Sequence, residues 1–236
     1  MDQIQRVELL NRAKDFFRNY IIDAHINKAA AVAGKLKNYN VNPFLFKYLA
    51  NFLKGNDDPR SIAEALIYPR LLGSSINTIF GMRIQIMINE LFQGYGSAVS
   101  GIDIEFVDGV DGRKKYCQVK SGPNTINKDD VKTVFDHFQS TRNLARTNNL
   151  NIGINDMIVG IVYGDVSELS SHYKKINDQY PVYIGSDFWH RLTGKDDFYL
   201  DLINAFGEVA LEVDGRGRLE EVIISLTEEI RLKYTP

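Results

Sequence analysis

The sequence is poor in the residues that build disulfides and zinc sites. It contains a single cysteine, Cys117, which excludes an internal disulfide and any zinc site made of several cysteines. His190 has neither a cysteine nor a second histidine at metal-ligand spacing, so we expect no zinc there. We also find no secretory signal and no apolar run of membrane-spanning length, and we therefore expect a cytoplasmic protein with no membrane partner.

The chain also lacks an excess of positive charge. Its 28 basic and 30 acidic residues give a formal net charge of −2, which counts against indiscriminate nucleic-acid binding. The charge is unevenly distributed, however. Between residues 112 and 146, eight basic residues stand against three acidic ones, and eight minus three leaves a local surplus of five. A DNA-facing side on an otherwise acidic body requires such a distribution.

Hydrophobic periodicity predicts an α/β fold. Helical patterns occupy residues 3–33, 43–53, 79–93, 127–146, 196–213 and 218–234, and strand patterns occupy 101–107, 114–120, 156–163 and 180–184. Residues 156–163 are apolar throughout, as in a strand covered on both faces. We therefore expect a mixed central β-sheet flanked by helices in residues 71–236, with C-terminal helices. Residues 1–70 would form a helical N-terminal region that dimerises or clasps a partner.

Residues 100–122 organise the rest of the chain. Ile102, Ile104 and Phe106 alternate with polar residues, which is the period of a half-buried strand. Two Asp-Gly dipeptides at 108–109 and 111–112 favour a tight turn, and residues 116–120 form the return strand. This pattern predicts a β-hairpin.

The hairpin brings three polar side chains together. Asp103 is expected opposite Gln118 or Lys120, which share one face of the return strand. A carboxylate can hold Mg²⁺, and a nearby lysine can orient the attacking water and offset charge on a phosphate. Phosphodiester hydrolysis needs those parts. Because this spacing is a loose pattern, an exposed hairpin with ordinary polar residues on its wet face remains the alternative.

The segment resembles the active site of the PD-(D/E)xK nuclease superfamily. Residues 101–103 (GID) stand in place of the "PD", and residues 118–120 (QVK) stand in place of the "(D/E)xK". The run QVKSGPNTIN at 118–127 is more specific, and it is similar to type II restriction endonucleases that cut GGNCC-containing sites. The resemblance extends over residues 73–206. It implies that Asp103 and the Val119 carbonyl bind the metal, that Lys120 positions the water, and that Gln118 and Glu90 assist.

Two positions depart from the superfamily pattern. Ile102 replaces the proline, which supplies no ligand, whereas Gln118 replaces an acid and removes one negative charge from the site. Three interpretations stay open. Gln118 itself ligates the metal or positions water, or Glu90 or Glu105 takes over as ligand, or the site is inactive.

Two polar segments are candidate DNA contacts. The first is expected at a helix entrance, where backbone amides and hydroxyls suit phosphate oxygens. The second leaves the return strand and enters a helix capped by Asn127. The candidates are Arg70, Ser74, Ser75, Asn77 and Thr78 in the first segment, and Ser121, Asn124, Thr125, Asn127 and Lys128 in the second.

The resemblance implies a type II restriction endonuclease. Such an enzyme would use Mg²⁺ to cut both strands of duplex DNA at a short palindrome, GGNCC-like by resemblance, and would act as a homodimer. Two alternatives remain from the sequence. One is a repair or junction-resolving nuclease of the same superfamily, and the other is a DNA-binding protein with a dead site.

Overall fold

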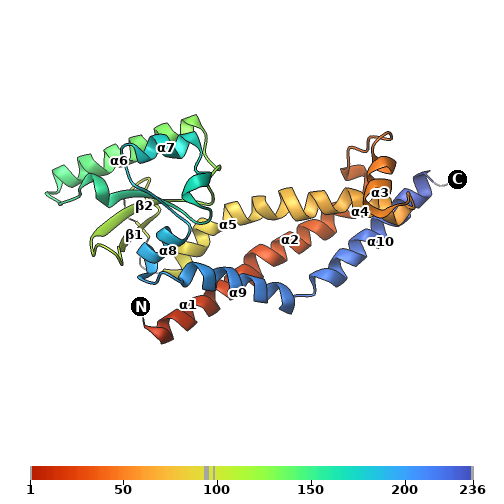
Figure 1. Cartoon of the computed structure of the whole chain (residues 1–236), viewed down its shortest axis with the longest axis horizontal. Helices are drawn as coiled ribbons and strands as arrows, with labels where there is room; N and C mark the ends of the chain where they lie inside the picture. The colour runs from red at the N-terminus through yellow and green to blue at the C-terminus, as the bar shows by residue number, and fades with distance from the viewer. Residues whose placement is uncertain (1, 93–95, 98, 235–236) are drawn as a thin grey trace. The chain divides into compact units, whose positions relative to one another are not determined.

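The computed structural model describes residues 2–92, 96–97 and 99–234. The chain forms two compact units, each built from separate stretches of sequence (Figure 1). Unit 1 comprises residues 1–13 and 84–205, and unit 2 comprises residues 14–83 and 206–236. The predicted boundary near residue 70 therefore falls inside unit 2.

Unit 1 contains the four-stranded sheet, ordered β1-β2-β3-β4. The strands are β1 (Ile104–Val107), β2 (Lys114–Lys120), β3 (Met157–Ile161) and β4 (Val182–Ile184). β1 pairs with β2 in antiparallel fashion, whereas β2–β3 and β3–β4 are parallel. The α/β fold with a mixed sheet is thereby confirmed, and each strand lies within or at the range that its hydrophobic pattern predicted.

One face of the sheet is covered by α6 (Lys128–Thr147) and α7 (Ser171–Asn177) (Figure 1). Buried side chains of α6, such as Val134 and Phe138, belong to one apolar cluster with Val159 and Ile161 of β3. α6 begins where the sequence predicted, because the Asn127 side chain accepts from the backbone amides of Asp129 and Asp130 and the Asp130 side chain accepts from the Asn127 amide.

α8 (Ser186–Thr193) packs on the other face of the sheet. Phe188 packs so closely on β3 that a Cβ atom at Gly160 would lie 2.2 Å from its ring, so only glycine fits there. Trp189 is fully buried, and its indole N–H donates to the Val162 carbonyl at 2.9 Å. The β3 strand is thus covered on both faces, as its unbroken apolar sequence predicted.

The remaining helices belong to unit 2 or contain residues of both units. Arg60 and Glu220 join α4 (Pro59–Pro69) to α10 (Gly215–Tyr234) through two hydrogen bonds of 2.6 and 2.8 Å. Buried residues of these two helices and of α3 (Phe46–Lys54) form one apolar cluster. The α-helices are α1 (Gln3–Phe16), α2 (Asp23–Lys28), α3 (Phe46–Lys54), α4 (Pro59–Pro69), α5 (Ile76–Leu91), α9 (Phe198–Glu212) and α10 (Gly215–Tyr234). Short 3-10 and π segments are η1 (Phe17–Ile22), η2 (Ala29–Ala33), η3 (Leu36–Asn38), η4 (Arg70–Ser75), η5 (Ile154–Asp156) and η6 (Val166–Glu168).

The helix entrance predicted at residues 70–78 is wrong. The chain stays helical from α4 through the π-helix η4 into α5, so no helix begins there. Gly73, Ser74 and Ser75 are weak helix formers, but propensity is a weak constraint that packing overrides. Leu71 and Ser75 are buried at 5% and 7% exposure, which holds this stretch in a widened helix rather than a loop.

That continuous helix, Pro59–Leu91, is long and apolar enough to cross a membrane by length and composition alone. One such helix is weak evidence for a membrane span, so it does not overturn the expectation of no membrane partner. The core helix of a globular protein passes the same test, and Ile62, Ala63 and Ile67 of this helix are buried in the apolar cluster of unit 2.

Candidate active site

Asp103 lies just before β1 and faces the end of β2. The register pairs Ile104 with Cys117, and the Asp103 amide donates to the Cys117 carbonyl at 3.0 Å. The next position along the ladder therefore brings Asp103 beside Gln118. The Asp103 Oδ2 atom accepts a 2.7 Å hydrogen bond from the Val119 amide, which ties the carboxylate to the middle residue of the QVK triplet.

Gln118 and Lys120 share the face of β2 that α6 covers. They are two residues apart on the strand, and Gln118 is buried with only 3% of its surface exposed. The Gln118 Nε2 atom lies 3.1 Å from Nδ1 of His137, a residue of α6. Lys120 is half-buried, and its positive charge acts on the Asp103 carboxyl. The structure thus gathers the acid, the amide and the amine predicted to form one site.

Gln85 of α5 completes this group and was not foreseen from the sequence. Its Nε2 atom donates to the Val119 carbonyl at 2.6 Å and to Asp103 Oδ2 at 3.3 Å. The structure places Glu90 elsewhere: its side chain is exposed, and the Arg12 guanidinium binds its carbonyl oxygen. Five residues of α-helix turn the chain by about 500°, or about 140° beyond one full turn, so Gln85 and Glu90 face different directions.

Glu105, the other candidate to replace the missing acid, is engaged away from this group. Its carboxylate accepts from the Ser97 hydroxyl at 2.5 Å and pairs with Lys114 at 2.6 Å. In the ladder it stands opposite Tyr116 rather than Gln118.

Burial, a hydrogen bond and a nearby charge act together on the Asp103 carboxyl. Burial raises its pKa above the ordinary value, while the Val119 hydrogen bond and the charge of Lys120 act in the opposite direction. A carboxylate that burial penalises gains from a nearby positive charge.

The oxygens at this site fit a metal that keeps part of its water shell. The carboxylate, the Val119 carbonyl and the Gln118 amide are three oxygen-bearing groups, and Mg²⁺ binds few protein oxygens and retains several waters. Within the described part of the chain, no cluster of three or more His, Cys, Asp or Glu residues forms a metal site. The donor set therefore suits a hard cation and not zinc.

The basic surplus of residues 112–146 is smaller on the surface than in the sequence. Arg113 forms a bidentate pair with Asp156, and Lys114 pairs with Glu105. Lys115 is fully buried, and its Nζ lies 2.6 Å from Asp111. The three acids, Asp156, Glu105 and Asp111, all lie outside residues 112–146, so the charge count for that range did not include them. These three basic side chains therefore form ion pairs at the sheet. The ones that remain are Lys120, Lys128, Lys132, Arg142 and Arg146.

The loop between β2 and α6 uses some of its polar side chains internally. The Asn127 amide oxygen caps α6, and the Thr125 hydroxyl bonds the Gly122 carbonyl at 2.9 Å and the Tyr173 hydroxyl at 3.1 Å. Asn124 and Lys128 are exposed, and Ser121 is half-buried. Of the predicted contacts in this loop, these three have no side-chain hydrogen bond to a described residue.

The contacts predicted at residues 70–78 belong to unit 2. Arg70 donates to the Asn38 carbonyl and stacks on the Tyr39 ring, 4.9 Å from its centroid. Asn77 and Thr78 are exposed, and the Ser75 hydroxyl is buried without a hydrogen-bond partner in the part of the chain that the structure describes. The side chain of Ser74 lies outside the described structure. Arg70, Ser75 and Thr78 help to line a cavity of about 220 Å³ together with Lys28.

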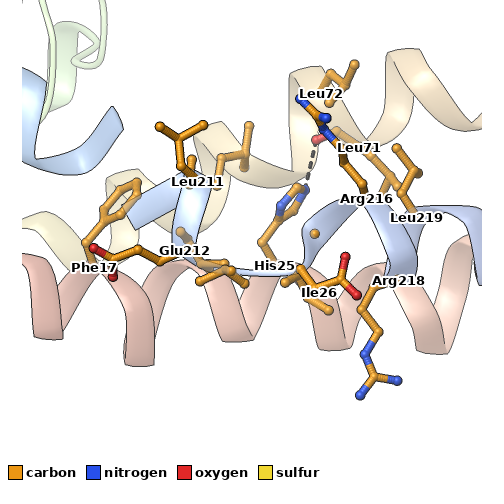
Figure 2. Close-up of a pocket in the computed structure, with 16 residues that line it drawn as sticks. Phe17, His25, Ile26, Leu71, Leu72, Leu211, Glu212, Arg216, Arg218 and Leu219 are labelled. Atoms are coloured by element: carbon orange, nitrogen blue, oxygen red, sulfur yellow. Dashed lines mark hydrogen bonds between the residues drawn. The ribbon is translucent and has the colours of Figure 1, made fainter. Parts of the chain in front are cut away.

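Unit 2 also contains a larger pocket of about 690 Å³ (Figure 2). Apolar side chains such as Phe17, Ile26 and Leu211 line much of it, and His25 Nε2 lies 3.0 Å from the Leu71 carbonyl. Because a carbonyl only accepts, Nε2 carries the proton and His25 is a structural donor. None of the predicted catalytic residues lines this pocket.

One family of known sequences matches the chain. The family described as Type II restriction endonuclease EcoO109I matches residues 10–214, which is most of the chain. The chain belongs to this family. It is therefore a type II restriction endonuclease, a site-specific nuclease that acts on DNA, and enzymes of this class generally use divalent metal ions. A search among curated proteins finds no match.

The match includes residues of both units and the site on β1 and β2, and it ends before α10. Two residues at that site, Gln85 and His137, were not predicted from the sequence. Each stands beside the apolar stripe of an amphipathic helix, Gln85 next to buried Ile84 and His137 next to buried Phe138. A polar residue at the margin of a buried stripe was the only available signal.

Proposed function

We propose that this restriction endonuclease hydrolyses phosphodiester bonds in both strands of duplex DNA at a short palindrome, with Mg²⁺ as its cofactor and in the cytoplasm. The observation that carries the proposal is the grouping of Asp103, Gln118, the Val119 carbonyl and Lys120 at one end of β2. A GGNCC-like target rests on the sequence resemblance of residues 118–127.

Each group has a role that its position supports. Asp103 and the Val119 carbonyl would hold the metal, and Gln118 would supply a third oxygen. Bound Mg²⁺ supplies Lewis-acid stabilisation of the phosphate and lowers the pKa of a coordinated water. Lys120 would orient the attacking water and offset negative charge on the phosphate. Gln85, rather than Glu90, is the α5 residue whose side chain contacts both of these groups.

DNA contact is best supported for the loop after β2 and for the exposed side of α6. Ser121, Asn124 and Lys128 have side chains available to DNA, and Lys132, Arg142 and Arg146 are exposed on α6. Asn127 and Thr125 are better assigned to holding the loop in place. In unit 2, the Ser75 hydroxyl has no hydrogen-bond partner among the described residues, and it lines one cavity with Lys28 and Arg70, a combination that suits a phosphate oxygen.

A palindromic target implies two copies of the chain related by a twofold axis, because each active site cuts one strand. An apolar stripe at and before α3 suits contact between the copies. Phe44, Tyr48 and Phe52 follow at intervals of four residues and are 88%, 59% and 74% exposed.

The test is digestion of a sequenced plasmid by the wild-type chain and by Lys120→Ala, each with Mg²⁺ and with a chelator. We expect Mg²⁺-dependent fragments of defined size for the wild type, with ends that map to one palindrome, and no fragments for Lys120→Ala. Preference for branched over linear DNA would instead indicate a repair or junction-resolving enzyme. If the wild type bound DNA without cutting it, the site would be inactive, which is the alternative that follows from Gln118 in place of an acid.

A further inference from the structure

An amide in the place of an acid poses a problem of orientation. Both oxygens of a carboxylate can bind a metal, whereas a glutamine side chain has one oxygen and one NH₂ group that repels a cation. Gln118 is 3% exposed, so it is confined within the protein rather than free in solvent. A glutamine ligand at this position therefore needs a partner that fixes which end of the amide faces the metal.

His137 has the chemistry of that partner. Its Nδ1 atom lies 3.1 Å from the NH₂ nitrogen of Gln118. For the amide to donate, Nδ1 must be the unprotonated acceptor, and the ring proton then sits on Nε2. With its nitrogen held by His137, the amide presents its oxygen to other groups.

The backbone makes room for the imidazole. Gly101 has φ +82°, and a Cβ atom there would lie 2.3 Å from Cγ of His137. The glycine two residues before Asp103 thus allows the ring to lie against the chain that carries the carboxylate.

We propose that His137 is a positioning residue that fixes the Gln118 amide with its oxygen toward the metal, which lets glutamine replace the acid of the catalytic triplet. The inference rests on the proposed function, since it concerns the same Mg²⁺ site. It predicts that His137 matters for metal binding only while residue 118 is a glutamine.

The test is a double-mutant cycle read by Mn²⁺ binding, measured by electron paramagnetic resonance on the whole chain without DNA. His137→Leu removes the acceptor. It should weaken Mn²⁺ binding by about two- to tenfold, the cost of ordering one long side chain. His137→Asn keeps an acceptor oxygen where Nδ1 stands and should bind Mn²⁺ as the wild type does. In a Gln118→Glu background, His137→Leu should not weaken Mn²⁺ binding, because either oxygen of the carboxylate can bind the metal.

Each outcome has a defined meaning. An equal loss of affinity in the wild-type and Gln118→Glu backgrounds would overturn the proposal, since His137 would then act only through packing. Failure of His137→Asn to restore binding would overturn it as well, provided that the thermal unfolding midpoint of this variant is unchanged. Asp103→Asn separates the two hypotheses. If Asp103→Asn leaves Mn²⁺ affinity unchanged, the assignment of the metal site is wrong. If Asp103→Asn weakens Mn²⁺ binding but His137→Leu has the same effect with Gln118 and with Glu at position 118, only the role of His137 is rejected.

Discussion

Lys115→Met is expected to destabilise unit 1 severely. The Lys115 ammonium is fully buried, 2.6 Å from Asp111, 3.6 Å from Asp156 and 3.9 Å from Asp108, and it donates to the Asn155 carbonyl at 3.1 Å. Methionine keeps most of the side-chain volume but leaves buried carboxylates with less positive charge. Removing one partner from such a buried group costs about 3–5 kcal/mol.

The adjacent residue provides the matched control. Lys114 lies on the opposite side of the strand with 55% of its side chain exposed, and it pairs with Glu105. Exposed pairs of this kind contribute about 0.2–1 kcal/mol, so Lys114→Met should be nearly neutral.

Urea denaturation followed by tryptophan fluorescence measures the difference. Trp189 is the only tryptophan in the chain and is fully buried in unit 1, so it reports on the unit that contains Lys115. With a slope near 2 kcal/mol per molar urea, a loss of 3–5 kcal/mol lowers the midpoint by roughly 1.5–2.5 M. A Lys115→Met midpoint within about 0.5 M of the wild type would refute the view that Lys115 is a structural charge rather than a DNA contact.

Three further predictions concern packing, pH and assembly. Gly160→Val should lower the thermal midpoint of unfolding, because its Cβ would lie 2.2 Å from the Phe188 ring and overpacking costs about 1–3 kcal/mol; an unchanged midpoint would contradict the close packing of α8 on β3. The bidentate ion pair with Arg113 lowers the pKa of Asp156. The stability that ionised Asp156 gives the folded protein is therefore complete above the unfolded carboxyl pKa of about 3.9, and it is lost as the pH falls through the lower folded pKa. Asp156→Asn should therefore reduce the loss of stability in acid-titration curves below about pH 4, and parallel curves would count against the pair. The double variant Phe44→Ser, Phe52→Ser should shift the protein from dimer to monomer in light scattering, and an unchanged mass would exclude this stripe as the dimer surface.

Local sequence signals predicted the parts of the fold that depend on neighbours in the chain. Period-two alternation and Asp-Gly turns predicted the β1–β2 hairpin, and the Asn127–Asp130 spacing predicted the capping box of α6. Asp103 was expected opposite Gln118 or Lys120, and the register places it beside Gln118. These features follow from spacing along the chain alone.

Long-range packing determined what the sequence did not show. Gln85 reaches Asp103 only because α5 packs beside β2, and His137 reaches Gln118 only because α6 covers the same sheet face. The pairing of Arg113 with Asp156 joins residues 43 positions apart, so counting charges in a window overestimated the basic surface. The Gly-Ser stretch at residues 73–75 was misread as a loop because its buried neighbours keep it helical.

A comparison of two carboxylate-to-amide variants tests the central claim most directly. Asp103→Asn and Glu105→Gln differ by two positions, but only Asp103 contacts Val119 and Gln85, whereas Glu105 is held by Ser97 and Lys114. The rate of Mg²⁺-dependent plasmid cleavage should fall by about a thousandfold or more in Asp103→Asn, as loss of metal stabilisation worth several kcal/mol requires, and should change little in Glu105→Gln. Cleavage by Asp103→Asn at the wild-type rate would contradict the assignment of this site.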